Sequence, residues 1–145
     1  AIAQWKYDDK GNKTEERFCD ANQKLIVPID YGYAIAQWKY DDKSNEIEVR
    51  YYGAEEKLIK MMEHGYAIRQ LKYNSKGNIT EERYYGADEK LMMPACGYSI
   101  EQSQYDDRGK LTENRFYDSD EKLIVSKKWG FAIAKYKYDD KDKEI

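Results

Sequence analysis

The sequence predicts an all-β fold, an elongated array of tandem β-hairpins built as an open solenoid-like stack or a single-layer sheet. Three features predict it: a repeat of about 33 residues, short aromatic-rich segments that alternate with a period of two, and turn-forming residues between them. Charged residues make up 37% of the chain and its mean hydropathy is −1.03, so little material is left for a globular core. A thin sheet therefore fits the composition better than a compact domain.

The repeat is marked by glycines at matching positions, which recur at spacings of 33, 32 and 33 residues. We predict one repeat domain over residues 1–145, with four and a half copies. Because the chain starts one residue into a copy and stops within a hairpin, we expect it to be a fragment of a longer array. The copies are 1–32, 33–65, 66–97, 98–130 and the half copy 131–145.

Each copy opens with a predicted strand. In the second copy this strand covers residues 33–40, which are rich in aromatic and β-branched residues. Its alternation predicts Tyr33 and Ile35 on one face and Ala34 and Ala36 on the other. A turn, a second strand, a second turn and a variable connector complete the copy.

The two turns of a copy differ in sequence. The first reads Asp8-Asp9-Lys10-Gly11-Asn12, in which the aspartate accepts backbone hydrogen bonds and the glycine supplies the positive φ of a tight hairpin. Ser44 and Asp142 replace this glycine in two copies, which predicts looser or strained turns there. The second turn has glutamine or glutamate where glycine is expected, which favours a type I or short helical turn. Those residues are Gln23, Glu56, Glu89 and Glu121.

The connectors vary from copy to copy and end in glycine. Pro28 and Pro94 place them outside the hydrogen-bonded ladder or at its edge. Variable segments of this kind commonly carry the individual binding chemistry of a repeat protein. A helical solenoid is the alternative fold, although neither candidate helix would exceed about eight residues before a turn signal interrupts it.

The repeated residues resemble a known bacterial pattern. The run Tyr7-Asp8-Asp9-Lys10-Gly11-Asn12, followed by Lys24-Leu25-Ile26 and Gly32-Tyr33, is similar to bacterial hairpin repeats with the pattern Tyr-Asp-x-x-Gly-Asn and, more loosely, to the YD repeats of Rhs proteins and to MORN repeats. The motif is short, but its copies cover essentially the whole chain. The resemblance implies an extended β-sheet scaffold in bacterial surface, secreted or interaction proteins, and it brings no catalytic residue.

A glutamate and an arginine, two residues apart, recur in the second strand of every full copy. An extended backbone places both on one face. Two interpretations are open. The pair could line a groove, or it could form an ion-pair ladder between neighbouring hairpins that fixes their register. Repetition in every full copy favours the ladder. The residues are Glu15, Arg17, Glu48, Arg50, Glu81, Arg83, Glu113 and Arg115.

Aromatic side chains recur in columns along the predicted sheet. They could stack on sugar rings or enclose a quaternary ammonium group, as in choline-binding repeats. Packing within and between copies is the interpretation that we favour for most of them. The candidate ligand-contact aromatics are Trp5, Trp38, Tyr40, Tyr51, Tyr52 and Trp129.

The sequence predicts no enzyme activity, no cofactor and no metal site. It has no Cys/His zinc spacing and no glycine-rich phosphate loop, and the turn at residues 8–12 lacks the spacing of a calcium loop. His64 is the only histidine, and with Cys96 it forms the one candidate nucleophilic pair, without an evident third group. Cys19 and Cys96 fall at different repeat positions, so we predict free thiols.

The charge pattern excludes two partner classes. A net charge of −3 with interleaved signs argues against nucleic-acid binding, and the absence of a long apolar segment argues against membrane insertion. The leading hypothesis is a non-catalytic scaffold that binds a protein partner or associates with itself through exposed end strands. An aromatic-lined carbohydrate or choline-type module and a structural spacer or filament-forming repeat are the alternatives. The resemblance favours the cell surface or a secreted location.

Overall fold

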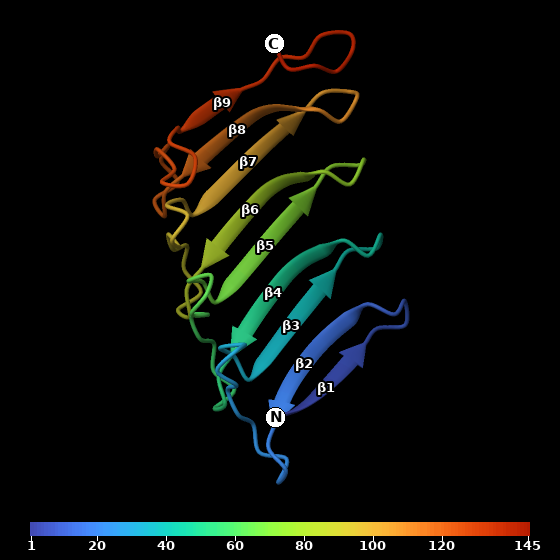
Figure 1. Cartoon of the computed structure of the whole chain (residues 1–145), viewed down its shortest axis with the longest axis vertical. Helices are drawn as coiled ribbons and strands as arrows, with labels where there is room; N and C mark the ends of the chain where they lie inside the picture. Colours follow the sequence, from blue (N-terminus) through green and yellow to red (C-terminus); the bar gives the residue numbers. More distant parts are fainter.

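A single sheet of nine antiparallel strands makes up the structure, a computed structural model that describes residues 1–145. The strands follow one another in sequence order, and no helix is present, so the predicted hairpin array is confirmed and the helical alternative is wrong. Figure 1 shows the hairpins side by side along the long axis, with their tips at one edge and the connectors at the other. The strands are β1 (Ile2–Tyr7), β2 (Lys13–Cys19), β3 (Ile35–Tyr40), β4 (Glu46–Tyr52), β5 (Ile68–Tyr73), β6 (Ile79–Tyr85), β7 (Ile100–Tyr105), β8 (Leu111–Tyr117) and β9 (Ile133–Lys135).

Pairing is long within a hairpin and short between hairpins. β3 and β4 pair at six positions, from Ile35 to Tyr40, whereas β2 and β3 pair at only three, from Glu15 to Arg17. The hairpins are therefore joined near the connectors and diverge toward their tips, as Figure 1 shows. The structure contains no helix that could span a membrane.

Both turns of a copy have the same backbone. In the first turn the Asp8 carboxylate accepts hydrogen bonds from two backbone N–H groups, and Gly11 has a φ of 85°. In the second turn the Asp20 carboxylate accepts the equivalent two bonds, and Gln23 has a φ of 64°. The N–H of Gln23 also donates to the Asp20 carbonyl at 3.1 Å, which closes a β-turn over residues 20–23 in keeping with the type I prediction. The left-handed conformation of Gln23, a non-glycine residue, was not predicted. The corresponding residues Glu56, Glu89 and Glu121 have φ angles of 57°, 61° and 61°.

The short span of the second turn explains its conformation. Cys19 pairs directly with Leu25 across it, and so small a loop closes between paired strands when one residue is left-handed. The first turn of the second copy lacks glycine, and it too contains a left-handed residue. Ser44 has a φ of 64° and keeps the closing bond from its N–H to the Asp41 carbonyl at 3.0 Å. This turn is strained, at a cost of about 1–2 kcal/mol, but it is not looser.

A continuous column of aromatic rings, here called the aromatic spine, runs along one face of the sheet. Its rings come alternately from the second strand of one copy and from the first residue of the next copy. Neighbouring ring centroids lie between 4.8 and 6.1 Å apart in tilted arrangements, which aromatic pairs favour. Connector residues such as Met61 pack onto it and complete the core. The spine consists of Phe18, Tyr33, Tyr51, Tyr66, Tyr84, Tyr98, Phe116 and Phe131.

Tyr33 lies on the opposite face from the one that alternation predicts. It packs with Ala36, and its hydroxyl donates to Glu16 Oε2 at 2.8 Å, although the pattern had placed it with Ile35. β3 begins only at Ile35, after a bend at Ala34, so the period of two does not extend back to Tyr33.

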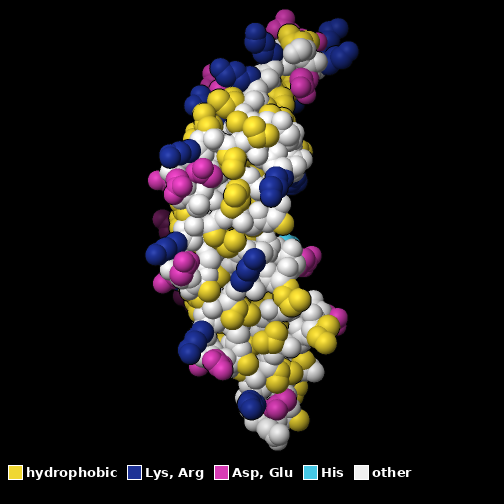
Figure 2. Space-filling model, turned by 90° about the vertical axis from the view of Figure 1, so that its left-hand side faces the viewer, with side chains coloured by type: hydrophobic (Ala, Val, Ile, Leu, Met, Phe, Trp, Pro, Cys, Tyr) yellow, Lys and Arg dark blue, Asp and Glu magenta, His cyan; other side chains and the backbone are white.

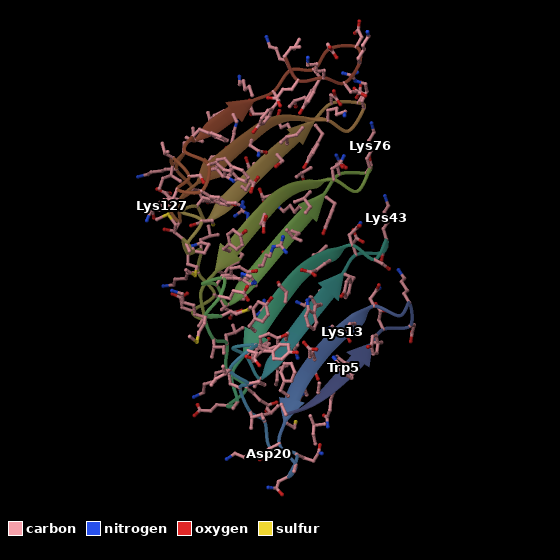
Figure 3. The ribbon with its side chains drawn as sticks, in the orientation of Figure 1. Trp5, Lys13, Asp20, Lys43, Lys76 and Lys127 are labelled. Carbon is pink, nitrogen blue, oxygen red and sulfur yellow. The ribbon has the colours of Figure 1, made fainter.

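The hairpin tips form a uniform edge, here called the tip edge. A tyrosine hydroxyl crosses from each of three hairpins to the preceding one, for example from Tyr73 to the Glu46 carbonyl at 2.7 Å. A lysine ammonium crosses in the other direction, for example from Lys43 to the Ser75 carbonyl at 3.3 Å. Figure 3 shows Lys43 and Lys76 at successive tips. These bonds close the space where the hairpins diverge.

Candidate interaction surface

The face opposite the aromatic spine carries the predicted Glu–Arg pairs, with the glutamates at its centre. Glu15 accepts a hydrogen bond from Arg17 Nε at 2.6 Å within its own strand. Lys6 Nζ lies 2.8 Å from its carboxylate across the hairpin, and Gln37 Nε2 of the next copy donates at 2.8 Å. One buried carboxylate thus connects β1, β2 and β3, and Glu48 and Glu81 repeat the arrangement.

These contacts keep the glutamates ionised. Burial raises the pKa of Glu15, Glu48 and Glu81, but hydrogen bonds from lysine, arginine and glutamine outweigh burial and lower each pKa from 4.5 to about 2. A carboxylate with so low a pKa is a poor proton acceptor near neutral pH. The chemistry of these residues is therefore structural.

The arginines extend to the following copy. Arg50 Nη1 lies 2.7 Å from Glu89 Oε1, and Arg83 Nη1 lies 3.1 Å from Glu121 Oε1. The acceptors are the left-handed glutamates of the second turns, so the strained residue makes an ion pair between copies that glycine could not make. The Glu–Arg pairs themselves form within one strand, and the contacts between copies use partners that the sequence pattern did not indicate.

The six candidate ligand-contact aromatics do not form one site. Trp5 lies on the spine's face of β1, where its Nε1 donates to Glu16 at 2.7 Å. Tyr51 is part of the spine, whereas Tyr52 follows it on the opposite face. Tyr40 donates its hydroxyl to the Lys13 carbonyl at 2.9 Å.

The two remaining candidates already have cations on their rings. Lys13 Nζ lies 4.6 Å from the ring centroid of Trp38, and Lys128 Nζ lies 4.6 Å from that of Trp129. A quaternary ammonium ligand would need those ring faces. The geometry therefore disfavours choline binding at both tryptophans.

The connectors form an edge of exposed apolar side chains, here called the connector stripe. Ile29 is 98% exposed and Met62 is 90% exposed, and every full copy contributes at least one such residue. Figure 2 views this edge and shows apolar side chains along the length of the molecule, flanked on one side by a regular row of acidic and basic side chains. Such a patch commonly marks an interaction surface. The stripe consists of Val27, Ile29, Tyr31, Met62, Met93, Val125 and Trp129.

Backbone hydrogen bonds shape the connectors. The N–H of Gly65 donates to the Met61 carbonyl at 2.8 Å, and that of Gly130 donates to Ser126 at 2.8 Å. The connectors also bond to each other, since the Lys128 N–H donates to the Cys96 carbonyl at 3.2 Å. The stripe is therefore preorganised, which lowers the entropic cost of binding.

A polar pocket of about 530 Å³, here called the central pocket, opens between the connectors of the second, third and fourth copies. Arg69, Glu82 and Glu101 project into it beside three tyrosines of the spine. Glu82 and Glu101 are direct cross-strand partners on β6 and β7. The sequence pattern did not predict this group, although one signal was present: three other copies have alanine at the position shared by Arg69 and Glu101.

His64 and Cys96 both line the central pocket, but no hydrogen bond joins them. The Cys96 thiol donates to the Tyr98 carbonyl at 3.6 Å, and burial raises its pKa. The His64 ring stacks on Tyr66 with centroids 5.7 Å apart. A thiol with a raised pKa is a weak nucleophile at neutral pH. Both cysteines are free, as predicted.

No group of three or more His, Cys, Asp or Glu side chains is arranged to hold a metal ion. Comparison with models of known protein families finds no match, and a search of curated proteins finds no relative. The resemblance to YD and MORN repeats therefore stays a prediction from the motif.

Proposed function

We propose that the chain is a non-catalytic scaffold whose connector stripe binds a protein partner. The observation that carries this proposal is the position of the exposed large apolar side chains. Apart from Leu123, they lie either on the stripe or in the first strand and the last half copy. Exposing so many apolar side chains along one edge is costly for an isolated chain, and a partner that covers them offsets that cost.

The composition of the stripe favours a protein over other partners. An apolar centre with charged side chains of both signs beside it resembles the core and rim of a protein interface. Each copy presents a different set, with Ile29 in the first, Met62 in the second and Trp129 in the fourth. A periodic glycan would be better matched by identical residues in each copy, and a passive spacer would need none of them.

A peptide selection tests the proposal. A displayed library of random peptides is selected on the wild-type array and then measured on a stripe variant that carries Ile29→Ser, Met62→Ser and Val125→Ser. We expect selected peptides to bind the stripe variant about tenfold or more weakly, because truncated interface anchors lose binding energy of this order. The stripe variant should fold, since Ile29 and Met62 are almost fully exposed.

A matched control replaces exposed apolar residues off the stripe, Ile2→Ser and Tyr7→Ser, which are 45% and 61% exposed. Peptide binding should survive in this control. Peptides that bind the stripe variant as well as the wild type, or a selection that yields none, would contradict the proposed function.

Self-association is a second proposal, supported by the sheet order. β1 and β9 each have a neighbour on one side only, and an unpaired strand edge can pair with another chain. β1 also exposes Ile2, Trp5 and Tyr7. Size-exclusion chromatography with light scattering should show a mass that rises with protein concentration, and a constant monomer mass would remove this proposal.

A further inference from the structure

The central pocket contains charged side chains that break the repeat on the spine's face of the sheet. The position of Arg69 and Glu101 is alanine in the first, second and last copies, whereas the position of Glu82 is glutamate in the first copy, valine in the second and asparagine in the fourth. Features present in every copy are explained by stacking. Two charged side chains, Arg69 and Glu101, at a position that is alanine in the other copies need a different explanation.

The charges of the pocket are not balanced. Glu82 and Glu101 are direct cross-strand partners, an arrangement that destabilises a sheet when both carboxylates are ionised. Arg69 Nε bonds Glu82 Oε1 at 2.5 Å, so this carboxylate is compensated. Glu101 accepts only from neutral donors, the Tyr98 hydroxyl at 3.0 Å and Asn114 Nδ2 at 3.2 Å, and it takes part in no ion pair.

Burial strengthens this imbalance. Burial raises the pKa of Glu101. The hydrogen bond from Tyr98 lowers this pKa, and the nearby Glu82 carboxylate raises it. Lys128 attracts Glu101 from the rim, but its ammonium lies over the ring of Trp129. A cation that entered the pocket would therefore meet a half-buried carboxylate without a close cationic partner.

The walls and the entrance fit a long basic side chain. The pocket is lined by Tyr66, Tyr84 and Tyr98, whose rings attract an ammonium or guanidinium group. Its volume of about 530 Å³ lies in the range of ligand pockets. Lys128 lines the pocket and directly precedes Trp129 of the connector stripe. Figure 3 shows its neighbour Lys127 at the connector edge. The pocket therefore lies next to the stripe.

We propose that the central pocket binds the ammonium or guanidinium group of a lysine or arginine side chain from the protein that lies on the connector stripe. This inference rests on the proposed function for its partner and adds a specificity site to it. The stripe supplies apolar contact, and Glu101 selects a basic residue at one position of the partner. The lysine or arginine stem lies against the tyrosine rings, and its charged end reaches the carboxylate.

A fragment titration followed by NMR tests the pocket without the partner. N-acetyl-lysine N-methylamide is titrated into the ¹⁵N-labelled array, with N-acetyl-norleucine N-methylamide as the uncharged analogue. We expect saturable shifts at the amides of Tyr84, Tyr98 and Glu101 with the lysine compound alone. Equal shifts with both compounds, or no shift at tens of millimolar, would overturn the inference.

Glu101→Ala is the variant of choice because alanine occupies this position in three other copies, so the array should fold. It should bind the lysine compound at least about tenfold more weakly, as expected for loss of a charge-assisted hydrogen bond. Lys128→Ala should bind it more tightly, because a competing ammonium is removed. Glu55→Gln is the control, since that side chain is 83% exposed on a second turn and should leave the affinity unchanged.

The two proposals fail separately. Stripe-binding peptides that contain no lysine or arginine, and that bind Glu101→Ala as well as the wild type, would overturn the inference and leave the scaffold function standing. Saturable binding of the lysine compound, combined with a selection that yields no stripe-dependent peptide, would support the pocket and contradict the scaffold function.

Discussion

The tip edge and the connector edge join the same hairpins, but they are built in opposite ways. At the tip edge each copy repeats one set of bonds, a tyrosine hydroxyl in one direction and a basic side chain in the other. At the connector edge the backbone turns are similar, whereas the side chains change in every copy and several are exposed apolar groups. The repeated bonds of the tip edge stabilise the stacking of the copies, and the varied side chains of the connector edge are available for recognition.

The two edges illustrate a general property of repeat proteins. A contact that recurs in every copy contributes to the interface between neighbours, so its loss should cost about the same anywhere in the array. A contact found in one copy has a local cost that depends on its surroundings. Single substitutions at the two edges test this distinction.

Gly97→Ala should be the most damaging connector substitution. Gly97 has a φ of 80°, and an added Cβ would lie 2.9 Å from the Lys127 backbone nitrogen and 2.7 Å from its Cβ. Gly130 has the same φ, with nothing within 4 Å of that position. We expect Gly97→Ala to lower the free energy of unfolding by about 3 kcal/mol or more, and Gly130→Ala by about 1 kcal/mol. Urea unfolding measures both, and equal losses would show that the connectors are not closely packed there.

Acid should weaken the ladder of glutamates that all copies share. The pKa values of Glu15, Glu48 and Glu81 are about 2 in the folded chain and near 4.5 when unfolded, so the unfolded state binds more protons between these pH values. Their contribution is complete above pH 4.5 and is lost as the pH falls toward 2. Glu48→Gln should cost about 2 kcal/mol at neutral pH and much less near pH 2.

Urea unfolding across this pH range measures the effect. Glu55→Gln, on an exposed second turn, should follow the wild-type curve at every pH. A wild-type free energy of unfolding that stays constant from pH 4.5 to 2 would contradict the low pKa values.

Tyr73→Phe should remove one of the uniform bonds of the tip edge. Its hydroxyl donates to the Glu46 carbonyl at 2.7 Å, and loss of such a bond costs about 1 kcal/mol. Tyr40→Phe and Tyr105→Phe should cost the same within error, because their hydroxyls make equivalent bonds. Tyr7→Phe is the control, since this side chain is 61% exposed. Costs that differ widely among the three would argue against a uniform tip edge.

Ser99→Ala should have the smallest effect and the opposite sign. The Ser99 hydroxyl is fully buried without a hydrogen-bond partner, and the equivalent residues of the two preceding copies are Ala34 and Ala67. Removing an unsatisfied buried hydroxyl should raise the free energy of unfolding by up to about 1 kcal/mol. Thermal and urea unfolding check the direction, and a loss of stability would mean that the hydroxyl has a partner such as an ordered water.

The strands and first turns were predictable because their signals are local. Alternation over residues 35–40 and the Asp-x-x-Gly turn depend on residues close together in the sequence. The face of Tyr33 and the left-handed second turns were not predictable from propensity. A bend at Ala34 sets the first, and loop closure between Cys19 and Leu25 sets the second.

The candidate site was predictable in part. The Glu–Arg pairs were found because they repeat, and the variable connectors were identified as the place for individual chemistry. The pairing partners of Arg50 and Arg83 lie 39 and 38 residues away, and that distance gave no local signal. Glu101 was missed because a search for repetition passes over the residue that breaks it.

The uneven strand pairing has a mechanical consequence. Six paired positions join the two strands of a hairpin, whereas three join one hairpin to the next. A pulling force along the long axis therefore ruptures the joints between hairpins before the hairpins themselves. The array should extend in discrete steps, and in each step one intact hairpin should separate from the next.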